Sequence, residues 1–109
     1  NGHEQVARAL LEAGARIETQ LPNGATALML SCQNGHAQVA RALLEAGADI
    51  DKPNNNGWTP LMKACSNGHE QVAHALLMAN ADPNKADAKG WVALMYACQN
   101  GHLEVTCPA

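Results

Sequence analysis

The tripeptide Asn-Gly-His recurs at a constant interval of 33 residues, and this period limits the possible folds more than any other feature of the chain. Its four copies begin at Asn1, Asn34, Asn67 and Asn100, without insertion or deletion between them. A fixed period of this length is typical of stacked supersecondary units, each of which buries its apolar face against its neighbours. The sequence therefore predicts a repeat array and not one closed globule.

The residues between these tripeptides predict two short helices in each repeat. Thr59 is suited to cap the first helix and Pro60 to begin it, and the Asn-Gly pair of the tripeptide is suited to end it. In the second segment, residues 37–46, apolar side chains recur at i, i+3, i+4 and i+7. Gly47 ends that segment, and Asn80 replaces this glycine in the next copy.

A polar stretch rich in turn-forming residues follows the second helix and leads to the glycine that opens the next repeat. Residues 51–56 and 84–89 are the two complete examples. Their Asn, Asp and Pro content predicts a protruding, hairpin-like loop.

This order of turn, helix, turn and helix resembles the ankyrin repeat. The residues that carry the match are Gly57, Thr59-Pro60-Leu61, Ala64, Gly68-His69, Val72, Leu76-Leu77 and Ala81-Asp82, with Gly47-Ala48-Asp49 in the preceding repeat. The resemblance extends from residue 1 to about Val105 and implies an all-α solenoid of stacked helix-turn-helix units joined by hairpin-like loops. One departure is that Met29, Met62 and Met95 replace the family's histidine after Thr-Pro-Leu, which we interpret as a packing substitution.

We place the whole chain, residues 1–109, in a single ankyrin-repeat domain. Its predicted parts are a half repeat with only the second helix at 1–23, full repeats at 24–56 and 57–89, a partial repeat at 90–105 and an irregular tail at 106–109. Pro108 would disrupt the second helix of the last repeat. Such ends are typical of a fragment, or of a chain with a foreign tail.

The two incomplete ends are complementary. The first part has a second helix without a first, and the last part has a first helix with only the start of a second. Head-to-tail stacking of two copies would complete one repeat and could propagate. Natural solenoids end in polar caps, whereas apolar residues such as Val6 and Met95 stand at these ends.

Charge, hydropathy and cysteine usage exclude several classes of function. The net charge is -3 and the lysines and arginines are scattered, so neither nucleic acid nor an anionic membrane is expected as a partner. No apolar run reaches transmembrane length, and no signal peptide is visible. Cys32, Cys65 and Cys98 stand one period apart, which indicates a buried repeat position and not a disulfide framework. Free thiols of this kind favour a reducing, intracellular compartment, the cytoplasm with the nucleus as an alternative.

The repeated histidines and cysteines are the only candidates for chemistry. The ankyrin resemblance implies that His36, His69 and His102 fix turns by hydrogen bonds to neighbouring loops. A Cys-x-x-x-His ladder could suggest metal binding, but tetrahedral zinc needs four converging ligands and these cysteines fall on an inward position. Cys107, in the irregular tail, is the candidate reactive thiol. Because nucleophile, phosphate-loop and paired-carboxylate motifs are also missing, we expect no catalytic residue, cofactor or metal.

The best interpretation of the chain is a protein–protein interaction module. By resemblance, a protein or peptide partner would bind the concave face, which the loop tips and the exposed sides of the first helices form. The residues expected to contact a partner are Trp58, Trp91, Tyr96, Lys63, Asn55, Asn56, Lys89, Gln33, Ser66, Gln99 and Leu30. Trp58 and Trp91 stand one period apart and should line up on adjacent tips, either packed against the next loop or as interface anchors.

Two further functions stay open. The chain could be a structural spacer that self-associates through its ends, or a thiol- or metal-responsive element that uses the repeated cysteines. The near-identity of the second helices would also suit a designed repeat protein, although periodic cysteines are an unusual design choice.

Overall fold

The computed structural model describes residues 17–99, together with Gln5 and Ala9. This part of the chain contains helices and connecting loops but no strand. The helices are α2 (Ala27–Gln33), α3 (Ala37–Glu45), α4 (Pro60–Ser66), α5 (Glu70–Met78) and α6 (Ala93–Gln99). The predictions that lie outside the described residues include most of the helix expected at 4–13, the turn-fixing role of His102, the helix start at 103–105, and the tail at 106–109.

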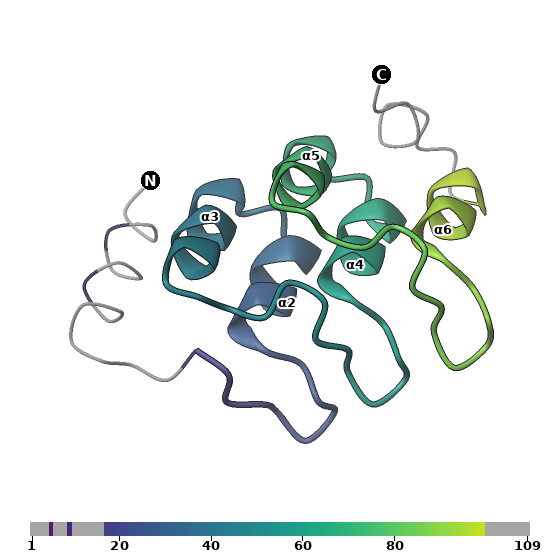
Figure 1. Ribbon diagram of the computed structural model, residues 1–109, viewed down its shortest axis with the longest axis horizontal. Helices are drawn as coiled ribbons and strands as arrows, with labels where there is room; N and C mark the ends of the chain where they lie inside the picture. The colour runs from purple at the N-terminus through teal and green to yellow at the C-terminus, as the bar shows by residue number, and fades with distance from the viewer. Residues whose placement is uncertain (1–4, 6–8, 10–16, 100–109) are drawn as a thin grey trace.

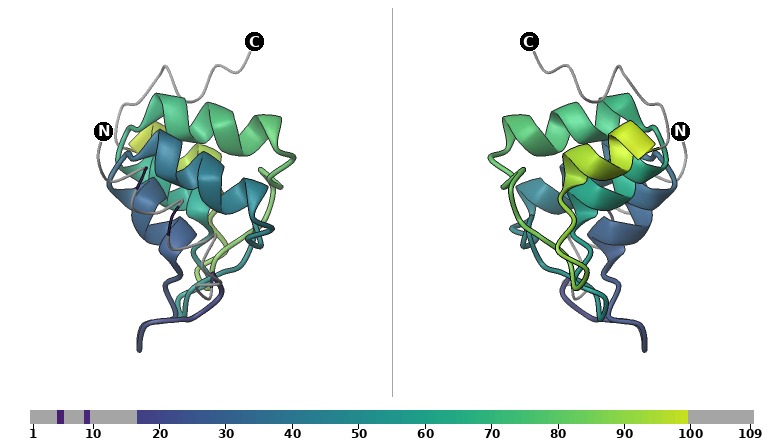
Figure 2. Two further views of the ribbon diagram at one scale, coloured as in Figure 1. Left: turned by 90° about the vertical axis from the view of Figure 1, so that its left-hand side faces the viewer. Right: turned by 90° about the vertical axis from the view of Figure 1, so that its right-hand side faces the viewer.

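The helices form two layers (Figure 1). Helices α2, α4 and α6 lie side by side in one layer, and α3 and α5 form the other. Helix α4 packs between α2 and α6, while α3 packs on α2 and α5 packs on both α4 and α3. The hairpin-like loops all project to the same side of the helices (Figure 2). This arrangement confirms the predicted all-α solenoid of helix-turn-helix units.

Threonine caps begin the first helices of two repeats. Thr26 and Thr59 each accept a hydrogen bond through Oγ1, at 3.3 Å, from the backbone N–H of Met29 and Met62 respectively. The Sδ of Met62 in turn accepts the backbone N–H of Thr59, at 3.4 Å. This thioether therefore fills the core position, as predicted, and also completes a capping box. In the third copy Val92 stands where the threonines stand, so α6 has no hydroxyl to cap it.

Neighbouring hairpins are joined by backbone hydrogen bonds. The N–H of Asn55 donates to the carbonyl of Asn23 at 2.9 Å, and the N–H of Ala88 donates to that of Asn56 at 3.1 Å. Gly57 makes this close approach possible, because a Cβ there would lie 2.8 Å from the nitrogen of Ala88. Its φ of +79° also lies in the left-handed region that favours glycine. The hairpins therefore form a continuous, hydrogen-bonded wall.

Polar side chains link the repeats at two other places. His69 Nε2 lies 2.9 Å from the carbonyl oxygen of Gln33 in the preceding repeat, which confirms the turn-fixing role expected of this histidine. The Oδ1 of Asp51 accepts the N–H of Asp82 at 3.1 Å. An equivalent bond joins Glu18 to the N–H of Asp49 one repeat earlier, at 2.7 Å.

The core is a strip of leucine, methionine, cysteine and alanine shared between repeats. Leu28, Met29, Leu61 and Met62 are almost completely buried, and small alanines on α3, α4 and α5 let the helices approach closely. Leu94, the equivalent of Leu61 on α6, is 55% exposed. Within the described part of the chain, no helix is both long and apolar enough to cross a membrane.

Candidate protein-interaction surface

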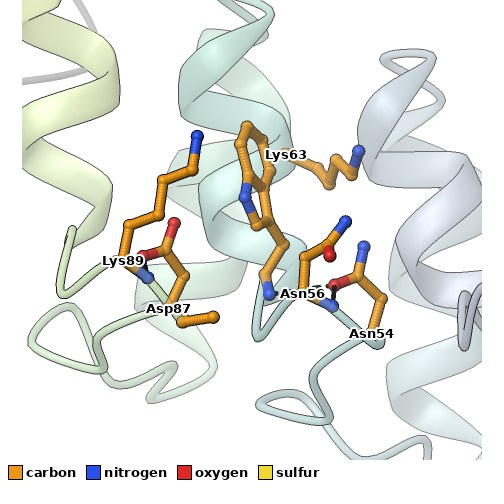
Figure 3. Close-up of a pocket in the computed structure, with 7 residues that line it drawn as sticks. Asn54, Asn56, Lys63, Asp87 and Lys89 are labelled. Atoms are coloured by element: carbon orange, nitrogen blue, oxygen red, sulfur yellow. Dashed lines mark hydrogen bonds between the residues drawn. The ribbon is translucent and has the colours of Figure 1, made fainter.

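A pocket of about 410 Å³ opens on the concave face, between two neighbouring hairpins and helix α4. Its walls come from the hairpin before α4, from α4 itself and from the hairpin before α6 (Figure 3). The lining residues are Asn54, Asn56, Trp58, Lys63, Asp87, Ala88 and Lys89. The pocket therefore spans two adjacent repeats.

The two hairpin tips are held by the same side-chain device. The Oδ1 of Asn54 accepts the N–H groups two and four residues later, at 2.9 and 3.0 Å. The Oδ1 of Asp87 accepts the equivalent pair, both at 2.9 Å. These turns fix the backbone just before Trp58 and Trp91 and so set where both indoles lie.

An aromatic cluster connects the two repeats. The ring centroid of Tyr96 lies 4.3 Å from that of Trp58 and 5.0 Å from that of Trp91. The Tyr96 hydroxyl donates a hydrogen bond to Oδ2 of Asp87. On the other side, the Lys63 ammonium lies 4.6 Å from the centroid of a Trp58 ring, at cation–π distance. The tryptophans therefore pack within the solenoid while both stay half-buried.

The environment of Asp87 and Tyr96 shifts their pKa values in opposite directions. Burial alone would raise the pKa of Asp87, but hydrogen bonds from the Tyr96 hydroxyl and two backbone N–H groups, together with the positive charge of Lys89, hold it below its usual range. Burial and the Asp87 carboxylate together raise the pKa of Tyr96 to about 12. At neutral pH the pair is therefore a charged acceptor with a neutral donor.

The predicted contact residues do not share one environment. Leu30, Gln33, Asn55, Asn56, Lys89 and Gln99 are exposed, and Trp58, Lys63, Ser66 and Trp91 are half-buried. Tyr96 is only 7% exposed, so in this structure it supports the tryptophans and presents little surface of its own. Four of the predicted residues line the pocket: Asn56, Trp58, Lys63 and Lys89.

Sequence reasoning missed two residues of the pocket. Asn54 and Asp87 line it and fix its hairpins, yet neither was among the expected contact residues. The available signal was their position three residues before Gly57 and Gly90, where an Asn or Asp side chain can bond to the backbone of the turn.

The repeated cysteines occupy two environments. Cys32 and Cys65 are buried free thiols, as expected, and burial raises their pKa values to about 12 and about 11. Cys98 is exposed, contrary to the expectation of a buried repeat position, because no described helix packs against that face of α6. Cys107 lies outside the described residues. Within the described residues, no three His, Cys, Asp or Glu side chains gather closely enough to hold a metal ion.

Comparison with known proteins agrees with this architecture. A family model described as ankyrin repeats (3 copies) matches residues 1–87 and again residues 54–107. The chain therefore belongs to the ankyrin-repeat family. Ankyrin repeats are generally protein–protein interaction modules, and the family is typically non-enzymatic. A search of curated proteins gave no match.

Proposed function

We propose that this chain binds a protein or peptide partner on its concave face, with the pocket between the two hairpins as the centre of the contact. The observation that carries the proposal is the pocket itself. It is about 410 Å³, lies across two repeats and contains a half-buried tryptophan between polar and cationic side chains. Apolar anchors surrounded by polar groups are typical of interface hot spots.

The hydrogen bonding of the pocket's hairpins supports this function. Its hairpins are fixed by the Asn54 and Asp87 turns and joined to each other by the bond from Ala88 to Asn56. A partner would therefore meet side chains whose backbone is already ordered. Such preorganisation reduces the conformational entropy lost on binding.

Peptide selection with two matched variants tests the proposal. Peptides selected from a random phage-displayed library on the wild-type chain are measured for binding to Asn56→Arg and Met78→Arg. Asn56 is an exposed residue of the pocket, whereas Met78 on α5 is 85% exposed and lies on the other helix layer. We expect Asn56→Arg to weaken binding at least about tenfold and Met78→Arg to leave it unchanged. Binding that is lost only in Met78→Arg would place the interface on the layer of α3 and α5 and contradict the proposal.

A second candidate function is self-association through α6. Leu94 and Met95 are 55% and 47% exposed, whereas their equivalents in α4, Leu61 and Met62, are buried. Another copy of the chain could cover this apolar face by stacking end to end. Light scattering across concentration, under reducing conditions, tests it. We expect a mass that grows with concentration and returns to that of a monomer in Leu94→Glu but not in Met78→Glu. A constant monomer mass for the wild type would rule the contact out.

A further inference from the structure

We propose that the concave pocket selects acidic segments, with partner carboxylates paired to Lys63 or Lys89 and a neighbouring side chain packed on Trp58. This inference rests on the proposed function and adds the chemical class of the partner. It is carried by the distribution of charge around the pocket and by the geometry of the two lysines.

Acidic and basic residues are mixed on the second helices and on the loops after them, where Arg41, Lys52 and Lys85 lie, but the pocket carries two lysines and one carboxylate. Among the residues expected to contact a partner, only Lys63 and Lys89 are charged, and both line the pocket. The described acidic residues other than Asp87 lie on the second helices or on the loops that follow them: Glu18, Glu45, Asp49, Asp51, Glu70 and Asp82. A chain with a net charge of -3 therefore presents a positive centre on its concave face.

Asp87 lines the same pocket, but its carboxylate is already engaged. Oδ1 accepts two backbone N–H groups and Oδ2 accepts the Tyr96 hydroxyl. The positive charge of Lys89 also attracts this carboxylate and contributes to the lowered pKa of Asp87, whereas Lys63 lies against the Trp58 ring. Two ammonium groups against one internally bonded carboxylate leave an excess of positive charge at the pocket.

The two lysines approach the pocket from different elements. Lys63 extends from α4 and Lys89 from the hairpin before α6, and the two side chains lie apart from each other in the close-up (Figure 3). The cation–π contact with Trp58 orders the Lys63 ammonium beside an apolar surface. A segment with one acidic side chain next to an apolar or aromatic one would match both features.

A protein segment fits better than a nucleic acid. Nucleic-acid affinity comes mainly from many phosphate contacts along a basic stripe. Here only two lysines line one pocket of about 410 Å³, which is a compact concave site and not a basic stripe.

The experiment compares charge reversal inside and outside the pocket. Peptides selected from the random library on wild-type protein are measured against Lys63→Glu/Lys89→Glu and against Lys52→Glu/Lys85→Glu. The second pair changes the net charge equally, and its positions do not line the pocket. Lys63→Gln/Lys89→Gln serves as a milder pair if the reversed pocket lowers folding stability. An unlabelled single-stranded oligonucleotide is added as a competitor.

We expect enrichment of Asp and Glu in the selected peptides. Binding should weaken roughly tenfold in either pocket pair and by less than about twofold in the Lys52/Lys85 pair, and added salt should weaken it. Neutral or basic peptides that still depend on Asn56 would overturn the acidic preference and leave the proposed function standing. Peptides whose binding is unchanged in Asn56→Arg, or a selection that yields no binding peptide, would contradict both the acidic preference and the proposed function. Displacement by the oligonucleotide at lower concentration than by acidic peptide would overturn the assignment to protein.

Discussion

At the scale of residues, the pocket depends on a single buried acid and its tyrosine partner. Asp87 holds a turn with one oxygen and the Tyr96 hydroxyl with the other. Tyr96 in turn contacts both tryptophans. The placement of the half-buried indoles therefore depends on a contact between a hairpin and a helix.

Replacing Asp87 with asparagine should lower the pKa of Tyr96. The chain has one tyrosine, so tyrosinate absorbance during an alkaline titration reports Tyr96 alone. We expect the pKa to fall from about 12 toward the ordinary value, while burial keeps it partly raised. The turn should survive, because Asn54 makes the same turn one repeat earlier. Asp82→Asn is the control, and an unchanged titration in Asp87→Asn would contradict the contact.

The raised pKa of Tyr96 also predicts how stability depends on pH. The unfolded chain ionises tyrosine near pH ~10, and the folded chain does so only near about 12. The folded state therefore disfavours tyrosinate, and the contribution of Tyr96 to the free energy of unfolding should be constant below about 10 and fall as the pH rises between these values. The buried thiols of Cys32 and Cys65, whose pKa values are also raised, add an alkaline loss of their own, so the wild type should lose more than Tyr96→Phe. Denaturant unfolding of wild type and Tyr96→Phe at both ends of the window measures this. An equal alkaline loss in Tyr96→Phe would assign it to other groups.

Thiol reactivity should separate Cys98 from its two equivalents. Burial and raised pKa values make Cys32 and Cys65 poor nucleophiles, whereas Cys98 is exposed. In a Cys107→Ser background, Ellman's reagent should modify Cys98 in the native state and the other two only after unfolding. Native-state modification of Cys65 at the rate of Cys98 would contradict the packing of α4.

At the scale of elements, the hairpins matter as a stacked set. Each tip donates a backbone hydrogen bond to the tip before it, and glycine lies where the backbones approach most closely. Helix α4 supplies a further side of the pocket through Lys63. A change in how the two hairpins stack should therefore alter the shape of the pocket that they line.

Gly57→Ala and Gly90→Ala form a matched pair that measures the stacking. Both glycines have a positive φ, so alanine should cost about 1 kcal/mol of backbone strain at either position. At Gly57 the new Cβ would also meet the next hairpin, whereas nothing lies within 4 Å of it at Gly90. We expect Gly57→Ala to lose roughly 1–3 kcal/mol more than Gly90→Ala. Equal losses in chemical denaturation would mean that the hairpins are not tightly stacked.

At the scale of the whole molecule, neighbouring repeats share the core. Equivalent residues therefore contribute differently to stability according to the neighbours that they have. Leu61 and Leu94 occupy the same position in α4 and α6, but they are 2% and 55% exposed.

Truncating these two leucines should give very different losses. We expect Leu61→Ala to lower the free energy of unfolding by about 2–5 kcal/mol, because it leaves a cavity between stacked helices. Leu94→Ala should cost less than about 1 kcal/mol, because most of that side chain already contacts solvent. Denaturant titration measures both, and similar losses would mean that α6 is covered in solution.

Much of this fold could be predicted from the sequence, because the repeat makes each helix and turn visible more than once. Thr59, Pro60 and Asn80 stand where capping and left-handed turns require them, and the structure confirms these roles. The pocket was less predictable. The burial of Tyr96 and its bond to Asp87 depend on how a hairpin folds back on the next helix. Local pattern does not determine such a contact between elements.

The exposure of Cys98 and Met95 was unpredictable for a related reason. Repeat position indicates burial only when a neighbour covers that face, and no described helix lies against theirs. Periodicity therefore identifies equivalent positions but not equivalent environments.

The most direct test of the central claim is to map a bound ligand onto the backbone. Amide chemical shifts are followed by NMR while the tightest selected peptide is titrated into the wild-type chain. We predict that the largest changes fall on residues 54–58, on α4 and on residues 87–91, which surround the pocket. Changes concentrated on helices α3 and α5, at residues 41–45 and 74–79, would contradict the assignment of the concave face as the binding surface.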